Sequence, residues 1–154
     1  MKVRVEKIEN HNEKESALLR VFKVDETITM VKQILEKYQT ILIVQDINSG
    51  VKEKINIHEV IYFEYLERNV FLYTKKSSYS LRTSLTKFME EYCNVFIQIR
   101  KNIGLNVYFL QSFATTNGGN LIVIVSTGEK LIVSRRYVKA LKESLSKLAS
   151  KSRL

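Results

Sequence analysis

The chain has 154 residues, 45% of them hydrophobic, with a formal net charge of +9 and one cysteine, Cys93. This composition supports one domain with a real core and excludes a disordered basic tail. A single cysteine excludes an intrachain disulfide, which suits a reducing compartment, and Cys93 is expected to be buried among its apolar neighbours. No apolar run approaches the roughly 20 residues that span a bilayer, and the N-terminus has no signal-peptide core. We therefore expect a cytoplasmic protein.

Positive charge is concentrated in the C-terminal part of the chain. Residues 1–46 carry eight Lys/Arg and eight Asp/Glu, which cancel. Residues 129–154 carry eight Lys/Arg and two Asp/Glu, a net of +6. Such an excess is typical of a surface that binds DNA or RNA. A solvated basic face that only aids solubility is the alternative explanation.

The N-terminal residues predict a small β-β-α segment. Residues 3–8 alternate charged and β-branched side chains, and residues 17–24 form a second run with strand character. Asp25 can then cap a helix. The apolar positions expected along one face of this helix are Ile28, Val31, Leu35 and Tyr38.

The middle of the chain predicts mainly strands. We expect strands at 41–45, 54–64, 70–74 and 78–81, with turns at 46–50 and 66–69. Thr83 or Ser84 can cap a short amphipathic helix. The apolar side of that helix consists of Leu85, Phe88, Met89 and Tyr92. Residues 95–99 and 107–113 are then expected to be extended.

The last third predicts a β-hairpin followed by a basic helix. Two β-branched runs flank residues 126–129, with Gly128 in the turn. The second run ends at Ser134, two adjacent arginines follow, and then lysines alternate with leucines at helical spacing. The predicted helices are separated by strands, so a helix-turn-helix is not expected. The fold class is α+β and mainly β, and any nucleic acid should be read by loops or strand ends.

Four segments in order resemble motifs of the LytTR family of bacterial DNA-binding domains. Residues 57–64 (IHEVIYFE) resemble the strand D-I-x-Y-x-E, and residues 79–85 (YSLRTSL) resemble the helix entry R-x-S-L. Residues 96–106 (FIQIRKNIGLN) resemble the motif F-x-R-x-H/S-x-S-x-x-V-N, and residues 127–137 (TGEKLIVSRRY) resemble the hairpin N-G-x-x-x-x-V-S-R-x-Y. The resemblance implies an elongated arrangement of β-sheets with short helices, at residues 40–150, whose loops enter successive major grooves. Residues 1–39 would precede this domain.

The resemblance also implies three places that contact DNA. The candidate residues are Arg68 and Asn69 at a hairpin tip, Arg100, Lys101 and Asn102 in a loop, and Ser134, Arg135 and Arg136 at the corner before the last helix. The resemblance implies that Arg136 best matches the family's base-contacting arginine. A guanidinium suits that role because it can donate two hydrogen bonds to guanine. Arg135 is expected at a phosphate. Lys139 and Lys142 lie on a face of the last helix that could follow the phosphate backbone, and a merely solvated face is the alternative. Arg68 and Asn69 could instead form only a polar turn, with Asn at positive φ.

The middle motif departs from the family pattern. Gln98 replaces a common arginine, Asn102 a usual serine and Gly104 a usual β-branched residue, whereas Asn106 is retained. The departures leave the recognised DNA sequence open. A glycine within a strand either weakens the strand or admits a close approach of another backbone.

The implied partners are double-stranded DNA and a second copy of the chain, bound together on repeated half-sites. About 40 residues precede the match, too few for a receiver domain, so the chain resembles the short stand-alone regulators. In that subgroup a small co-encoded membrane protein often inhibits the regulator. Residues 1–39 are therefore expected to serve dimerisation or inhibitor contact.

Two other functional classes fit parts of the sequence. Strands rich in aromatic residues could stack bases of RNA or of single-stranded DNA. These residues are Tyr62, Phe63, Tyr65, Phe71 and Tyr73, and strand alternation makes at least half of them core. The basic face could otherwise meet an acidic protein. We find no constellation of catalytic residues, no metal-ligand spacing and no phosphate-binding loop, so neither an enzyme nor a cofactor is expected.

Overall fold

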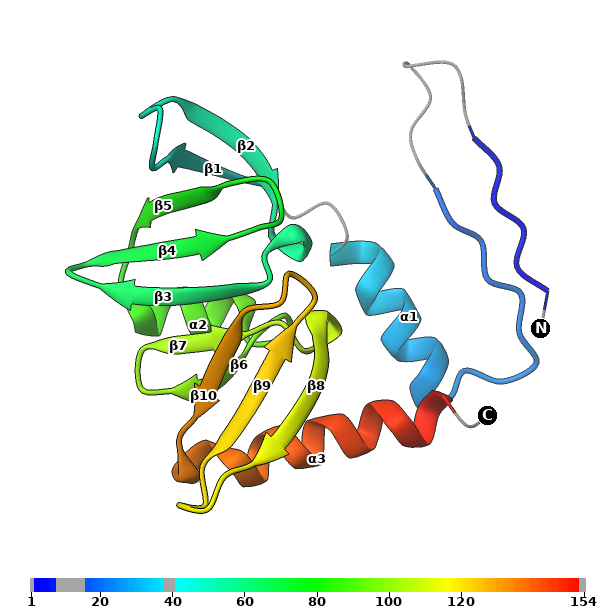
Figure 1. Ribbon diagram of the computed structural model, residues 1–154. Helices are drawn as coiled ribbons and strands as arrows, with labels where there is room; N and C mark the ends of the chain where they lie inside the picture. The colour runs from blue at the N-terminus through cyan, green and yellow to red at the C-terminus, as the bar shows by residue number, and fades with distance from the viewer. Residues whose placement is uncertain (1, 8–15, 38–40, 153–154) are drawn as a thin grey trace. The chain divides into compact units, whose positions relative to one another are not determined.

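The computed structural model describes residues 2–7, 16–37 and 41–152. The chain divides into two compact units, Met1–Tyr38 and Gln39–Leu154. Figure 1 shows one helix in the first unit, and two sheets with two further helices in the second.

The first unit contains the helix α1, Glu26–Lys37, and no strand in its described residues. Asp25 caps the helix as predicted: its carboxylate accepts a hydrogen bond from the Ile28 backbone N–H at 2.9 Å. The strands predicted at residues 3–8 and 17–24 are not formed in the described parts of these segments. A strand needs a neighbouring strand for its backbone groups and a core for its side chains, and these residues are almost all exposed. Ile8 and Tyr38 lie outside the described residues.

The second unit begins with a seven-stranded antiparallel sheet. Its strands are β1 Ile41–Asp46, β2 Lys52–Asn56, β3 Tyr62–Leu66, β4 Asn69–Tyr73, β5 Ser78–Arg82, β6 Ile97–Arg100 and β7 Ile103–Leu105. The strand order is β2-β1-β5-β4-β3-β7-β6. Helix α2, Leu85–Tyr92, packs on one face of this sheet, and Ser84 caps it by accepting a hydrogen bond from the Lys87 N–H at 3.2 Å.

The core under α2 is rich in aromatic rings. Phe63 is fully buried and meets Phe88 and Phe96 edge to face, with ring centroids 4.8 and 5.1 Å away. Gly104 is opposite Phe63 in the neighbouring strand, and a Cβ atom at Gly104 would lie 2.2 Å from the Phe63 ring. The glycine therefore admits a side chain, rather than the close backbone that the sequence suggested.

A three-stranded antiparallel sheet and a long helix complete the second unit. The strands are β8 Leu110–Thr115, β9 Leu121–Val125 and β10 Lys130–Val133, in the order β10-β9-β8. Helix α3, Arg135–Ser152, follows β10 directly. Its Leu141 is fully buried in a second core with Val123 and Val133. The predicted hairpin with Gly128 in its turn and the predicted last helix are confirmed.

Two 3-10 turns interrupt the predicted strands. Ile57–Glu59 divides the single strand predicted at residues 54–64 into the end of β2 and the start of β3, and Val107–Phe109 delays the strand predicted at residues 107–113, so that β8 begins at Leu110. In each case an asparagine caps the turn. The side chain of Asn56 accepts a hydrogen bond from His58 N–H at 2.9 Å, and that of Asn106 accepts one from Tyr108 N–H at 3.2 Å.

Hydrogen bonds join the two sheets of this unit into one structure. The buried Asn106 donates its side-chain N–H to the Val60 carbonyl at 3.1 Å. The Tyr62 hydroxyl donates to the Glu129 carboxylate in the β9–β10 turn at 2.6 Å. Burial, followed by this carboxylate, raises the Tyr62 pKa far above its usual value, so the hydroxyl keeps its proton. The two sheets thus hold a fixed geometry for the loops between their strands.

Candidate nucleic-acid interface

The three loops singled out by the sequence meet at one end of the second unit. The antiparallel register places the β3–β4 tip and the β6–β7 turn at the same end of the large sheet. The Tyr65 N–H, next to the tip, donates to the Asn102 carbonyl at 2.7 Å. The Ser134 N–H, at the corner before α3, donates to the Ile99 carbonyl at 3.0 Å. In Figure 1 the three loops lie one below another along the left side of the second unit.

The β3–β4 tip holds two residues in a left-handed backbone conformation. Glu67 has φ 50° and Arg68 has φ 64°. The alternative of a plain polar turn predicted positive φ at Asn69 instead. Asn69 is in β4, and its side-chain amide donates to the Glu67 carbonyl at 3.0 Å, which supports the turn. Glu67 and Arg68 are both exposed, so the tip presents one carboxylate and one guanidinium to a ligand.

In the β6–β7 turn, Arg100 and Lys101 are exposed, whereas Asn102 holds the turn in place. The Asn102 amide donates to the Tyr65 carbonyl at 3.3 Å, in addition to the backbone bond between these residues. Gln98 donates to the Lys101 carbonyl at 3.3 Å. The β6–β7 register shifts between Gln98 and Arg100, and such bulges re-aim side chains at the end of a strand. The turn therefore presents two cations on a braced backbone.

The β10–α3 corner presents Arg135 and Arg136, both exposed. Ser134 is partly buried. Its backbone N–H donates to the Ile99 carbonyl, and its carbonyl accepts a hydrogen bond from the Tyr137 N–H at 2.8 Å. The Arg135 side chain lies against Gly119 in the β8–β9 turn, where an added Cβ would be 3.3 Å from Arg135 Nε. The Arg136 guanidinium carbon is 5.8 Å from the centre of the Tyr137 ring.

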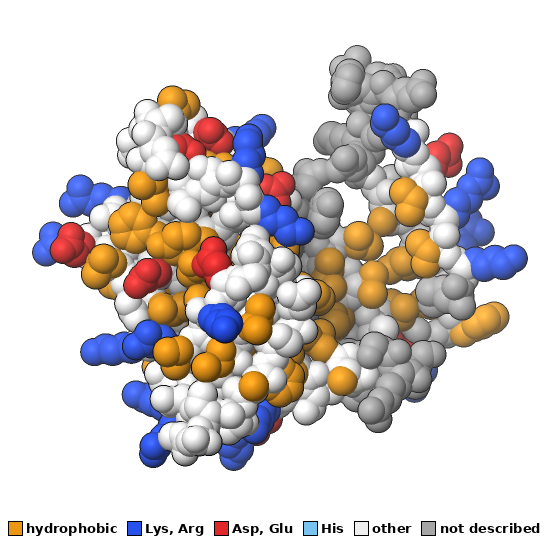
Figure 2. Space-filling model, in the orientation of Figure 1, with side chains coloured by type: hydrophobic (Ala, Val, Ile, Leu, Met, Phe, Trp, Pro, Cys, Tyr) orange, Lys and Arg blue, Asp and Glu red, His pale blue; other side chains and the backbone are white. Residues whose placement is uncertain are grey.

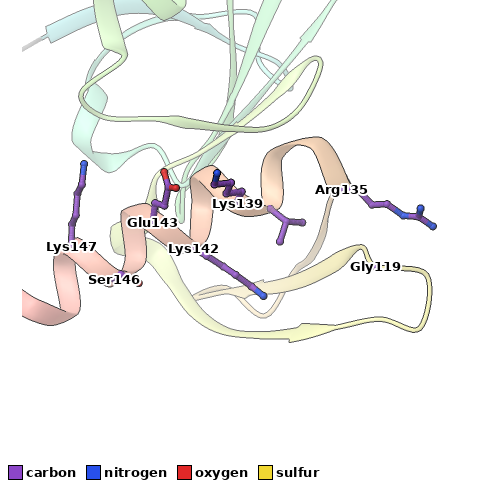
Figure 3. Close-up of a pocket in the computed structure, with 8 residues that line it drawn as sticks. Gly119, Arg135, Lys139, Lys142, Glu143, Ser146 and Lys147 are labelled. Atoms are coloured by element: carbon purple, nitrogen blue, oxygen red, sulfur yellow. The ribbon is translucent and has the colours of Figure 1, made fainter.

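A basic groove continues from this corner along α3. It is open, measures about 670 Å³, and is shown in Figure 3. Lys139 and Lys142 line it together with Arg135, Gly119 and the acidic Glu143. In Figure 3, Lys142 extends from the helix toward the β8–β9 hairpin. Since a helix rises about 1.5 Å per residue, Lys142 is roughly 10 Å along the axis from Arg135.

The sequence did not reveal two parts of this end of the unit. Arg82 is exposed at the end of β5, where it pairs in register with Asn69 at the tip. Gly119 brings the β8–β9 turn against Arg135. Only the strand register could have located Arg82, and nothing in the local sequence marks the contact at Gly119. Lys and Arg side chains, with some acidic ones, gather along the left edge in Figure 2.

The aromatic strands offer little surface to an unpaired base. Phe63 is in the core, and Tyr62 and Tyr73 stack on each other with ring centroids 4.4 Å apart. Tyr65 and Phe71 are half-buried.

Cys93, expected to be buried, is exposed at the end of α2. Among the described residues, no three metal-ligating side chains come together, and no described helix has the length and apolar character of a membrane span.

Comparison with known proteins agrees with this geometry. The model of the LytTR DNA-binding domain family matches residues 51–146. The fold is similar to that of the LytTR DNA-binding domain of a putative methyl-accepting/DNA response regulator from Bacillus cereus, with a TM-score of 0.59 and 17% identity, over 70% of this chain and 97% of that one. The chain therefore has a LytTR-type fold with its loops gathered at one end. It belongs to the LytTR DNA-binding domain family.

Curated relatives include uncharacterized HTH-type transcriptional regulators of Staphylococcus aureus. Those of strains NCTC 8325 and MRSA252 are 28% and 27% identical over 92 residues. The match covers 60% of this chain and 63% of each relative, so more than a third of their length is unmatched. In the described part of this chain, the helices are separated by strands and form no helix-turn-helix.

Proposed function

We propose that the protein is a sequence-specific transcriptional regulator that reads the major groove of duplex DNA through loops. The observation that carries this proposal is the hydrogen-bonded junction of the three loops, through Tyr65 with Asn102 and Ile99 with Ser134. Loops fixed to one end of a stiff sheet can face a single duplex together. Transcription regulation is also what the Staphylococcus relatives are named for. We expect a regulator of this kind to act in the cytoplasm.

The exposed cations divide into base readers and phosphate contacts. Although Arg136 was matched above to the family's base-contacting arginine, the motif V-S-R-x-Y aligns its arginine with Arg135 and its variable position with Arg136. Arg135, expected above at a phosphate, therefore shares the base-reading role in this proposal. Arg100 and Lys101 contact the groove next to the one that Arg135 and Arg136 read. Arg68 and Arg82 contact the phosphate backbone beyond that groove. Lys139 and Lys142 follow the phosphates along α3, where they set orientation without reading sequence. Ser134, Asn69 and Asn102 support the loops.

The protein acts as a homodimer on two spaced half-sites. Joining two modest modules raises the affinity of the second binding step through effective concentration. By analogy with stand-alone relatives, a small co-encoded membrane protein binds and restrains it. Co-purification of the product of a neighbouring gene would test that partner.

The test uses duplex sites selected from a random pool, with binding measured by fluorescence anisotropy. Arg135→Ala and Arg136→Ala, tested separately, should each reduce the preference for the selected site. A bidentate guanine contact is worth about 1–3 kcal/mol of discrimination. Lys142→Ala should weaken all sequences alike and reduce the slope of log K against log salt by about 0.9. Full preference in both arginine variants, or tighter binding of single strands than of duplex, would contradict the proposal.

A further inference from the structure

The β3–β4 tip is a two-residue turn built from residues that such a turn disfavours. Leu66 and Asn69 pair in register, so Glu67 and Arg68 form the turn between them, and both have positive φ, at 50° and 64°. Turns with positive φ at both central residues are normally made by asparagine and glycine, which adopt this conformation at little steric cost. Glu67 and Arg68 instead place side chains on a strained backbone, a combination that clusters at functional sites.

Glu67 is the one acidic residue of the three loops. Residues 66–69, 100–102 and 134–136 together contain five Lys/Arg and one Asp/Glu, and the Glu67 side chain is exposed. A carboxylate only accepts hydrogen bonds, so the phosphates of DNA, which are also negatively charged acceptors, repel it. On a surface that meets duplex DNA, Glu67 can therefore gain energy only from the amino groups of the bases.

We propose that Glu67 reads a cytosine by accepting a hydrogen bond from its N4 amino group in the major groove. Cytosine N4 and adenine N6 are the amino groups that this groove exposes. Adenine also presents N7, an acceptor that repels a carboxylate, so cytosine is the better partner. Arg68 contacts the phosphate beside that base. The inference rests on the proposed function and adds to it a residue that determines specificity.

The tip holds the backbone of Glu67 in place for such a contact. The Asn69 amide donates to the Glu67 carbonyl at 3.0 Å. Tyr65, two residues before Glu67, donates its N–H to the Asn102 carbonyl at 2.7 Å, which ties the tip to the β6–β7 turn. A side chain carried by a fixed backbone has less freedom to lose when it binds.

Selection of duplex sites from a random pool, repeated with the Glu67→Gln protein, tests the inference. The wild-type sites should contain a cytosine whose replacement lowers affinity by roughly tenfold. In the sites selected by Glu67→Gln, this position should change toward adenine or lose its preference, because a glutamine amide can pair with both N6 and N7 of adenine. The other positions should stay the same.

Glu143→Gln is the matched control, since Glu143 lies among the lysines of the groove along α3. The same substitution there removes a carboxylate that lies near phosphates in the proposed complex. It should tighten binding to all sequences alike and change no base preference.

Glu67→Gly separates recognition from folding. Glycine adopts positive φ without strain, so this variant should be at least as stable as the wild type. Its preference for cytosine at the position read by Glu67 should nevertheless disappear. A loss of preference in a protein of undiminished stability does not come from damage to the fold.

Wild-type sites without such a cytosine, or Glu67→Gln sites identical to those of the wild type, would overturn the inference and leave the proposed function intact. A uniform gain of affinity in Glu67→Gln, as expected of Glu143→Gln, would also overturn it, because the carboxylate would then only repel phosphates. If the wild-type protein enriched no duplex sequence at all, the proposed function itself would fail.

Discussion

At the scale of single residues, Gly104 determines how the main core packs. A Cβ there would lie 2.2 Å from the Phe63 ring, which is itself wedged between Phe88 and Phe96. The ring cannot move aside, because its neighbours are buried on the same side of the sheet. Gly104 and Phe63 thus form a matched pair, a small residue facing a large one. A β-branched residue at position 104 would require a smaller partner at position 63.

We predict that Gly104→Ala lowers the free energy of unfolding by about 1–3 kcal/mol, the usual cost of overpacking. Phe63→Leu made by itself should lower the free energy of unfolding. The double variant with Gly104→Ala should lose less than the sum of the two single losses, because the smaller side chain makes room for the added Cβ. Urea denaturation of the four proteins measures this coupling. Gly118→Ala is the control, since a Cβ at Gly118 meets nothing within 4 Å. Additive effects of the two core substitutions would show that the ring does not limit this site.

At the scale of elements, the β3–β4 hairpin carries backbone strain at its tip. Glu67 and Arg68 both have positive φ, a conformation that costs a residue other than glycine roughly 1–2 kcal/mol. The Asn69 amide bond to the Glu67 carbonyl helps to hold it. Strained turns of this kind cluster at functional sites. Here the strain accompanies the outward presentation of Arg68.

Glu67→Gly should therefore raise the free energy of unfolding by about 1 kcal/mol, since glycine adopts positive φ without a steric penalty. Thermal melting monitored by circular dichroism measures the change. Glu67→Gln removes the same charge but keeps the Cβ, so it should leave stability close to that of the wild type. Equal stabilisation by both substitutions would mean that charge repulsion, rather than φ, is relieved.

Local patterns predicted the elements well, and they could not predict how distant elements join. The hairpin of β9 and β10, the helix α2 with its Ser84 cap, and α3 follow from periodicity and turn chemistry. The 3-10 turns were missed because an asparagine side chain bonding two residues ahead leaves the apolar pattern unchanged. Of the site, the three loops were predicted from the resemblance. Arg82 was missed because only the register with Asn69 brings it there.

At the scale of the whole second unit, the candidate site depends on contacts between segments far apart in sequence. Asn102 and Tyr65 are 37 positions apart, and their two hydrogen bonds fix the β6–β7 turn to the β3–β4 hairpin. The Ser134–Ile99 bond fixes the end of β6, next to the same turn, to the corner before α3. The middle turn is thus the piece to which both outer loops are attached. Loss of its bracing should affect all three loops at once.

Asn102→Ala separates bracing from direct contact, because the substitution removes the side-chain bond to Tyr65 and leaves every cation in place. A typical hydrogen bond contributes about 0.5–1.5 kcal/mol, so affinity for the selected site should fall by roughly twofold to tenfold. The slope of log K against log salt should stay unchanged, since the number of neutralised phosphates is the same. Lys101→Ala is the matched control in the same turn: if Lys101 contacts a phosphate, that slope should decrease by about 0.9. A shallower salt slope in Asn102→Ala would instead mean that loosening the turn withdraws its cations from the DNA. The role of Asn102 would then be to hold those cations at the phosphates.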